Sequence, residues 1–426
     1  MAKILLKNVQ ALLEDGSVAE KNIAIENDKI VKIGEVDTSW VPDQVLDGKD
    51  KLAIPGFINT HTHASMTLLR SYADDMQLMD WLQNKIWPIE AKMSSNDIYW
   101  GAMLAVAEMI KTGTTTFVDM YSEMHRVAEA VEESGMRAVL SRGMIGVAPN
   151  GQEALAESKK LFRDYHQTAN NRIRVMLAPH APYTCPPAYL RQVVDSAKEL
   201  GAEIHIHLSE TLGEVEDCKK QYGKSPIALM EEVGVLDCGV LAAHCVHVSS
   251  EDIALMKKYN VRVAHNPGSN MKLASGISPV AKMLSAGISI GLGTDGASSN
   301  NNLDMLEEVH LVSLLHKVHH LDPLAIPALT SIKMATEYGA KVAGFDDIGV
   351  LKEGYKADIT LFNMNSTQWF PRHDLLSLLV YSANSSHVDT VIIDGKIVLE
   401  KGILTIIDEE RILYEANKRA QDLIRK

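Results

Sequence analysis

Eight short apolar segments, separated by longer stretches, are the feature that most restricts the fold of this chain. Segments that are apolar along their whole length are typical of parallel strands buried on both faces. Eight such strands with helices between them, in about 290 residues, predict a closed (β/α)₈ TIM barrel rather than an open sheet. The segments are AIPGFIN (53–59), TTTFVDM (114–120), AVLSRGM (138–144), IRVMLAP (173–179), EIHIHLS (203–209), VLAAHC (240–245), VRVAHNP (261–267) and ISIGLGTD (288–295).

The stretches between these segments carry apolar residues at helical spacing, and Ser, Asp or Pro stands near the start of several of them. This pattern predicts helices over residues 95–111, 151–169, 187–200, 249–259 and 324–343. A further helix is expected in the C-terminal segment DEERILYEANKRAQDLIRK.

Both ends of the chain differ from the middle. Short alternating strands are expected in ILLKNVQALL, NIAIEN and KIVKIGE near the N-terminus, and in KADITLFN, VDTVIIDGKIVL and GILTII near the C-terminus. Asp394-Gly395 is a strong hairpin turn signal. We therefore expect a small antiparallel β-sandwich domain built from residues 1–57 plus 350–426, beside a barrel domain of residues 58–349.

Nearly every predicted barrel strand ends in a side chain that can bind metal, move a proton or carry charge. In a (β/α)₈ barrel the C-terminal ends of the strands converge on the active site. We therefore expect these side chains to meet at one face. They are His61, His63, Asp119, Arg142, His180, His207 with Glu210 beyond it, His244, His265, Asn266 and Asp295.

The pair His61 and His63 is the clearest candidate for a metal site. Residues two apart on a strand point to the same face, so both imidazoles could share one ion. Buried histidines that hydrogen-bond to the backbone give the same pattern. The spacing alone therefore leaves both readings open.

Five motifs occur in the order PGFINTHTH, HIHLSE, AAHC, AHNPGSNMKLASG and GTDGASSNN. Together they resemble the amidohydrolase superfamily, and in particular its mononuclear aminohydrolases, which deaminate purines and related rings. The resemblance covers nearly the whole chain. It implies a (β/α)₈ barrel beside a β-sandwich made from both termini, in agreement with the strand pattern.

The resemblance implies that His61, His63, His207 and Asp295 bind one divalent metal ion. Three imidazoles and a carboxylate suit Zn²⁺, our first choice, or Fe²⁺. Binuclear relatives use a carboxylated Lys at the end of the fourth strand, which IRVMLAPHAP lacks, so we expect a single ion. Spacing cannot choose between His205 and His207, but the family motif selects the His three residues before Glu210 and leaves His205 in the barrel core or behind the ligands.

The implied reaction is hydrolytic deamination of an adenosine-type nucleoside, with 5′-methylthioadenosine and S-adenosylhomocysteine giving inosyl products and ammonia. Water is the nucleophile. By this resemblance Glu210 moves its proton, His244 hydrogen-bonds the attacking water, and Asp295 accepts from it; Glu210 and Asp295 also contact the substrate.

Substrate recognition is expected from residues 65–90, a long segment that we interpret as a lid, and from two strand ends. The family places Glu90 on the ribose hydroxyls and His180 on the nucleoside. Arg142 could grip the amino-acid carboxylate of S-adenosylhomocysteine, or pair with Asp119 or Glu123.

The formal net charge of −13 argues against a nucleic-acid partner. No apolar stretch approaches the roughly 20 residues needed to span a membrane, and MAKILLKNVQ lacks the pattern of a signal peptide. We expect a cytoplasmic protein with a small-molecule nucleoside substrate, no membrane partner, and a homo-oligomeric state.

Two other functions fit the same motifs. One is a relative that acts on guanine, cytosine or a triazine, and the other is a barrel that serves as a non-catalytic scaffold. Scaffolds lose metal ligands, whereas this chain keeps all four. Two further patterns have structural interpretations: we expect His316, His319 and His320 to be surface or interface residues, and Asn300 to Asn302 to cap the following helix.

Overall fold

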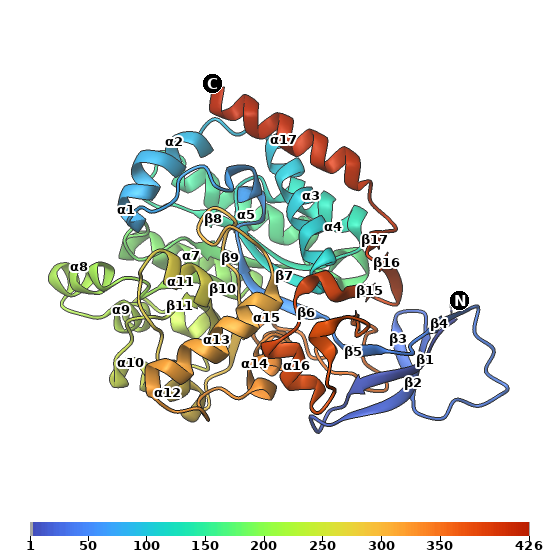
Figure 1. The fold of residues 1–426 in the computed structure, drawn as a ribbon. Coiled ribbons are helices and arrows are strands. Elements are labelled where there is room, and N and C mark those ends of the chain that lie inside the picture. Colours follow the sequence, from blue (N-terminus) through green and yellow to red (C-terminus); the bar gives the residue numbers. More distant parts are fainter. Residues whose placement is uncertain (1–2, 426) are drawn as a thin grey trace.

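The computed structural model describes residues 3–425, which form two sheets surrounded by helices (Figure 1). One sheet contains eight parallel strands in sequence order, each paired with the next along the chain. Each of the eight predicted segments overlaps one of these strands, so this prediction is confirmed, although the first segment also includes the end of β5 (Lys51–Pro55) of the other sheet. The strands are β6 (Phe57–Thr62), β7 (Thr114–Tyr121), β8 (Arg137–Met144), β9 (Ile173–Pro179), β10 (Ile204–Leu208), β11 (Val240–His244), β12 (Arg262–His265) and β13 (Ile290–Leu292).

The last strand returns to the first and closes the barrel. The Asp295 amide donates to the His61 carbonyl at 2.9 Å, and the Thr60 hydroxyl donates to the Leu292 carbonyl at 2.8 Å. The side chain of Asn59, within β6, accepts from the amide of Thr294, just beyond β13, at 3.0 Å. These bonds bring the ends of β6 and β13 together, so residues far apart in sequence become neighbours at the barrel mouth.

Helices cover the outside of the barrel. Three predicted helices are present with nearly the expected bounds, and α3 begins with a capping box in which Ser94 and Asp97 satisfy each other's backbone amides. The principal helices are α3 (Ser95–Lys111), α4 (Met124–Ser134), α5 (Gly151–Tyr165), α7 (Pro187–Leu200), α8 (Leu212–Tyr222), α9 (Pro226–Glu232), α10 (Ser250–Lys258), α11 (Pro267–Lys272), α12 (Val280–Ser285), α13 (Met305–His320), α14 (Ala328–Met334), α15 (Glu337–Ala343) and α16 (Leu375–Tyr381).

Two helix predictions need correction. The single helix expected over 324–343 is two short helices, α14 and α15, because Thr336 between them has the non-helical angles φ −132° and ψ −95°. The helix expected over 151–169 ends at Tyr165, and Gln167 beyond it has a positive φ of 65°. The short α6 (Thr168–Asn171) follows.

The segment after β6 crosses the barrel mouth as a series of short helices. It contains the 3₁₀ helix η1 (Ala64–Leu69), α1 (Leu78–Trp81), the π-helical turn η2 (Leu82–Ile86) and α2 (Trp87–Glu90). Trp81, Leu82 and Ile86 are buried. The segment therefore packs on the barrel as a helical insertion and also covers the site described below.

Strands from both ends of the chain form a second, nine-stranded sheet. Its order is β17-β16-β15-β14-β5-β1-β2-β3, and β4 also pairs with β1. The sheet is mixed rather than antiparallel, because β4 and β5 both run parallel to β1. The strands are β1 (Lys3–Leu12), β2 (Val18–Glu26), β3 (Lys29–Ile33), β4 (Gln44–Asp47), β5 (Lys51–Pro55), β14 (Ile359–Asn363), β15 (Val388–Ile393), β16 (Lys396–Glu400) and β17 (Ile403–Leu404).

The two sheets are joined by a buried ion-pair network below the barrel. Arg137, at the start of β8, is 1% exposed and donates to Asp358 at 2.9 Å and to Asp394 at 3.2 Å. Asp394 and Gly395 form the predicted hairpin turn with positive φ angles of 51° and 74°. Arg137 therefore connects the barrel to strands from the C-terminal part of the chain.

The C-terminal helix α17 (Glu409–Arg425) lies along α3 of the barrel in Figure 1. Lys111 pairs with Glu409 at 2.5 Å, Arg419 pairs with Asp97 at 3.2 Å, and the Arg411 guanidinium lies 5.2 Å from the Trp100 ring. The chain therefore ends on the barrel rather than on the terminal sheet. Within residues 3–425, no helix has both the length and the apolar character needed to cross a membrane.

Candidate active site

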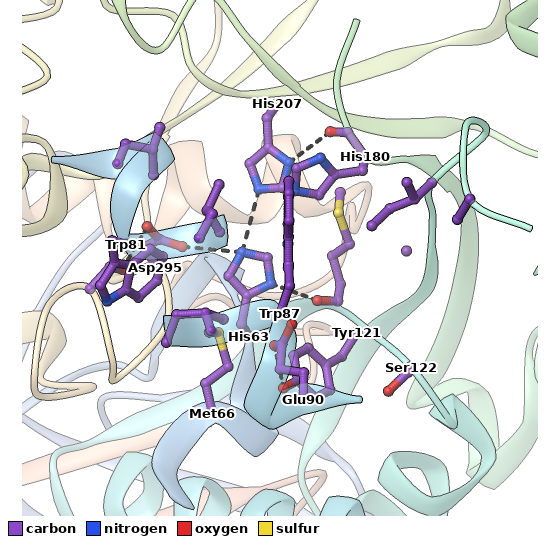
Figure 2. A pocket seen from close by; sticks show the side chains of 18 of the residues that line it. His63, Met66, Trp81, Trp87, Glu90, Tyr121, Ser122, His180, His207 and Asp295 are labelled. Carbon is purple, nitrogen blue, oxygen red and sulfur yellow. Dashed lines mark hydrogen bonds and ion pairs between the residues drawn. The ribbon is translucent and has the colours of Figure 1, made fainter. Parts of the chain in front are cut away.

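Three histidines and an aspartate from three strands converge at the barrel mouth. His207 Nε2, from β10, lies 3.2 Å from His61 Nε2 and 3.4 Å from His63 Nε2. Asp295 Oδ1, just after β13, lies 3.4 Å from His61 Nε2 and 3.2 Å from His63 Nε2. Figure 2 shows Asp295 and His207 both directed at His63. The structure thus brings the four predicted metal ligands together.

The second nitrogen of each ring has its own partner. His63 Nδ1 lies 2.6 Å from the Met120 carbonyl oxygen, and His207 Nδ1 lies 2.7 Å from that of His180. A carbonyl only accepts, so both Nδ1 atoms carry hydrogen and the Nε2 atom of each ring is directed at the centre. His61 Nδ1 contacts His205 Nε2 at 2.9 Å, which places His205 behind His61. These contacts orient the rings as metal ligands require.

Asp295 has one satisfied oxygen and one free oxygen. Its Oδ2 accepts from the Ser269 hydroxyl at 2.7 Å and from the Ser299 hydroxyl at 2.9 Å. Its Oδ1 is buried and has no hydrogen-bond partner among the described residues. A buried carboxylate oxygen without a donor, facing imidazole nitrogens, is the arrangement that a cation would complete.

The charges at this centre also fit a bound cation. Burial lowers the pKa of His61 to about 4, so this imidazole is neutral at pH 7. Burial alone would raise the pKa of Asp295, but the adjacent imidazoles of His61 and His63 hold it well below its ordinary value. A neutral His61 and an ionised Asp295 suit Zn²⁺ or Fe²⁺, and the cation would displace the proton of His63, whose pKa Asp295 raises to about 9.

Distance alone admits His244 as a further ligand. Within residues 3–425, two overlapping sets of ligand atoms lie within 4.8 Å of one another, namely His61, His63 and Asp295, and His61, His207 and His244. His244 Nδ1 contacts Asn270 Oδ1 at 2.9 Å. Its Nε2 lies 3.8 Å from Glu210 Oε2, so His244 lies between the ligand cluster and that carboxylate.

Glu210 is 5% exposed, and burial raises its pKa. Its Oε1 lies 3.4 Å from the Ser275 hydroxyl. A buried carboxyl with a raised pKa, beside a histidine and a metal-ligand cluster, can exchange a proton with a reacting group.

These residues open onto a cavity of about 480 Å³. His63, His207, Glu210, His244 and Asp295 line one end, while aromatic and aliphatic side chains of the segment after β6 line another part. His180 also lines the cavity, with its ring 4.7 Å from the ring of His207 and its Nδ1 3.0 Å from the Thr184 hydroxyl. A cavity with clustered polar groups and an apolar wall suits a small organic ligand.

Glu90 reaches this cavity from α2. The Tyr121 hydroxyl, at the end of β7, donates to Glu90 Oε1 at 2.5 Å, and burial raises the pKa of Glu90. In Figure 2 the two side chains lie together below His63, with Trp87 beside them. The segment expected to form a lid therefore contributes a carboxylate and aromatic rings to the cavity.

Arg142 also lines the cavity, but its predicted carboxylate partners are wrong. Its Nε donates to Glu157 Oε2 at 2.7 Å. Asp119 instead accepts from Thr62 Oγ1 at 2.9 Å and from the Ala64 amide at 2.7 Å. The sequence could not show this, because Glu157 lies on the outer helix α5.

Two buried carboxylates, Asp119 and Glu214, hold the chain segments that carry site residues. Asp119 bonds to both neighbours of His63, namely Thr62 and Ala64. Glu214, on α8, accepts 2.8 Å hydrogen bonds from the amides of Ser209 and Glu210. The position of Asp119 at a strand end was a signal for its importance, whereas Glu214 had none beyond its place four residues after Glu210.

Two structural expectations outside the cavity are wrong. His316 is fully buried and packs against His265 with ring centroids 5.6 Å apart, whereas His319 and His320 are exposed as expected. The N-cap of α13 is Asp304, whose side chain accepts from the amides of Leu306 and Glu307. Asn300 instead donates to Glu308 and to the Thr294 carbonyl.

The amidohydrolase family pattern matches residues 52–398, which include the whole barrel and the four clustered ligands. The chain belongs to the amidohydrolase family.

Individual relatives give a more specific comparison than the family pattern. The chain is 53% identical over 424 residues to a 5-methylthioadenosine/S-adenosylhomocysteine deaminase from Dictyoglomus turgidum, with 100% of both chains covered. It is 48% identical over 429 residues to a protein of the same description from Thermoanaerobacter pseudethanolicus, with 99% of this chain and 100% of the relative covered.

Solved structures agree with this fold. An adenosine deaminase from Xanthomonas campestris with bound zinc has a TM-score of 0.94 and 32% identity, with 100% of this chain and 99% of that chain covered. An atrazine chlorohydrolase from Arthrobacter aurescens TC1 complexed with zinc has a TM-score of 0.90 at 23% identity, with 99% and 100% covered, a likeness of fold alone.

Proposed function

We propose that this protein catalyses the metal-dependent hydrolytic deamination of adenosine-type nucleosides. Its substrates are 5′-methylthioadenosine and S-adenosylhomocysteine, and its products are the inosyl compounds and ammonia. The observation that carries the proposal is the unpartnered Oδ1 of Asp295. It faces His61 and His63, and Asp295 lines the same cavity as Glu210 and His244. The descriptions of the full-length relatives support the substrate class.

His61, His63, His207 and Asp295 would hold one divalent ion, and zinc fits the donor set best. Such an ion lowers the pKa of a coordinated water to roughly 7 and so supplies hydroxide at neutral pH.

The surrounding residues then move the protons. Glu210 accepts a proton from the attacking water and delivers it to the ring nitrogen next to the carbon that bears the amine. His244 hydrogen-bonds the water through Nε2, since its Nδ1 contacts Asn270. Asp295 accepts from the water through the oxygen that faces the cavity. A C–O bond forms at the ring carbon, and Asp295 takes the second proton of the water and passes it to the amine. The C–N bond then breaks, the carbonyl forms, and the amine leaves as ammonia.

The other end of the cavity would position the nucleoside. Glu90 can accept hydrogen bonds from both hydroxyls of a ribose, while Tyr121 holds its Oε1. His180 contacts the nucleoside beside the ligand cluster, and Arg142 faces the 5′ substituent. The apolar wall shields the thioether carbons from water.

The test is to incubate the purified protein with adenosine, methylthioadenosine, S-adenosylhomocysteine, guanine and cytosine and to measure ammonia. We expect release from the three nucleosides. The Glu210→Gln variant should keep its metal and lose roughly 10²–10⁴-fold in turnover, because an amide cannot accept the proton. Ammonia from guanine or cytosine alone, or full activity in metal-loaded Glu210→Gln, would overturn the assignment.

We further propose a homo-oligomer in the cytoplasm. Exposed apolar side chains on and just after α13, at Leu314, Val318, Leu321 and Leu324, support an interface between copies. Light scattering after size-exclusion chromatography tests the oligomeric state, and cell fractionation tests the location.

A further inference from the structure

Asp295 is held by two serines that come from different loops. Ser269 lies in α11 after β12, and Ser299 lies in the loop after β13. Both hydroxyls donate to Oδ2, which leaves Oδ1 directed at His61 and His63. The direction of the free oxygen therefore depends on where these two loops hold their serines.

A single buried carboxylate fastens both loops. Glu308, on α13, is 0% exposed, and its Oε2 accepts from the Gly268 amide at 2.9 Å. Its Oε1 accepts from the Asn300 side-chain amide at 2.7 Å. Gly268 directly precedes Ser269, and Asn300 directly follows Ser299. Glu308 thus holds the immediate neighbour of each serine.

Other contacts limit movement at this point. Asn300 also donates to the Thr294 carbonyl at 2.9 Å, next to Asp295 itself. A side chain at position 268 would collide with Glu308 Oε1, so only glycine allows the carboxylate to approach so closely. Among the described residues, the charged groups that act most on Glu308 are Glu307 and Asp304, which are acidic. Its partners are the two loops rather than a cation.

We propose that Glu308 is a positioning residue for the metal centre. Glu308 acts through Ser269 and Ser299 to orient Asp295. Burying a carboxyl without a cation destabilises a fold, so its place here is better explained by the two loops that it connects. Contacts behind the ligands commonly change metal affinity by about 10- to 100-fold. This inference rests on the metal site of the proposed function.

Glu308→Gln tests the proposal with little change in volume. Burial raises the pKa of Glu308 to about 8, so the comparison is made above that pH, where the carboxylate only accepts. The substitution then replaces one acceptor by a donor, which must face either the Gly268 amide or the Asn300 amide. Glu307→Gln is the matched control, because Glu307 is the exposed neighbour on the same helix. Zinc affinity, measured by competition with a chelator, should fall about tenfold in Glu308→Gln and stay unchanged in Glu307→Gln.

A spectroscopic signature separates positioning from general support of the fold. In the Co²⁺-loaded protein, the visible absorption of Glu308→Gln should differ from that of wild type, since the band reports the geometry of the ligands. Asn300→Ala removes the side-chain amide that donates to Glu308 Oε1. It should change the Co²⁺ absorption in the same way as Glu308→Gln and should also weaken zinc binding. It also tests the proposal if Glu308→Gln does not fold.

A double-variant cycle tests the route through the serines. If Glu308 acts through them, adding Glu308→Gln to Ser269→Ala/Ser299→Ala should weaken zinc binding by less than twofold further. If Glu308→Gln weakens zinc binding as much in the double-serine variant as in the wild type, Glu308 does not act through the serines. Unchanged zinc affinity and Co²⁺ spectrum in Glu308→Gln would overturn the proposal while leaving the proposed function intact, whereas a wild-type protein that binds no zinc would overturn both.

Discussion

Glu214 accepts a 2.8 Å hydrogen bond from the backbone amide of Glu210, the residue proposed to move the proton. Its second oxygen accepts from the preceding amide of Ser209, also at 2.8 Å, and Ser209 has a positive φ of 54°. The Ser209 carbonyl in turn accepts from the amides of Val246 and His247, just beyond His244. The loop that carries Glu210 and the loop that follows His244 are therefore held together by these backbone hydrogen bonds.

This arrangement predicts the behaviour of Glu214→Ala. Loss of both hydrogen bonds should let Glu210 move away from His244 and lower kcat roughly tenfold or more, with zinc content unchanged because no metal ligand is touched. Glu216→Ala, an exposed site on the same helix, is the control. Steady-state kinetics with zinc analysis checks the result, and loss of zinc together with activity would contradict it.

Removing a metal ligand should have a different effect. His61→Ala, His207→Ala and Asp295→Ala should each lose zinc affinity as well as turnover, because each deletes one of the four converging donors. Elemental analysis of the purified variants measures the metal directly. Wild-type zinc content in all three would show that the metal site lies elsewhere.

Zinc binding should strengthen as the pH rises. Burial alone would lower the pKa of His63, but the adjacent Asp295 carboxylate raises it to about 9 in the metal-free protein. His63 therefore carries a proton at pH 7 that zinc must displace, whereas His61, with a pKa of about 4, is already neutral. Affinity should rise about tenfold per pH unit up to about pH 9 and then level off. Chelator competition from pH 6 to 10 measures this slope, and an affinity that falls over the range would contradict it.

Arg142 should discriminate between the two proposed substrates. It can hold the amino-acid carboxylate of S-adenosylhomocysteine, whereas methylthioadenosine ends in a methyl group. Arg142→Ala should reduce kcat/KM for S-adenosylhomocysteine by about 1.5–3 kcal/mol and change that for methylthioadenosine much less.

The ion pair of Arg142 with Glu157 needs its own control. Glu157→Gln releases the guanidinium without removing it, so it should preserve the preference for S-adenosylhomocysteine. Equal losses on both substrates in Arg142→Ala would assign Arg142 to support of the barrel mouth.

The strands of the barrel could be predicted from the sequence because a strand such as the one in VLAAHC is buried on both faces and is apolar up to the histidine that ends it. The residues at the cavity could be predicted for a related reason. A polar side chain at the end of such a strand, as at His244 or Asp295, has no role in the apolar core and marks the barrel mouth.

The contacts behind these residues could not be predicted. Glu308 and Glu214 lie on helices where a carboxylate ordinarily faces water, and only the three-dimensional arrangement turns them toward backbone amides. The partner of Arg142 was missed because Glu157 approaches from a helix that follows the strand. The break at Thr336 could not be predicted because the helical spacing of apolar residues continues across it, whereas the backbone leaves the helical conformation there.

The closure between β6 and β13 constrains when the metal centre can exist. His61 and His63 come from the first barrel strand and Asp295 follows the last, while the His61 carbonyl accepts from the Asp295 amide. During synthesis, an N-terminal fragment that ends before residue 295 lacks one donor and cannot close the ring of strands. The complete ligand set thus arises only once the barrel has joined end to end, so metal binding is coupled to the last step of its assembly.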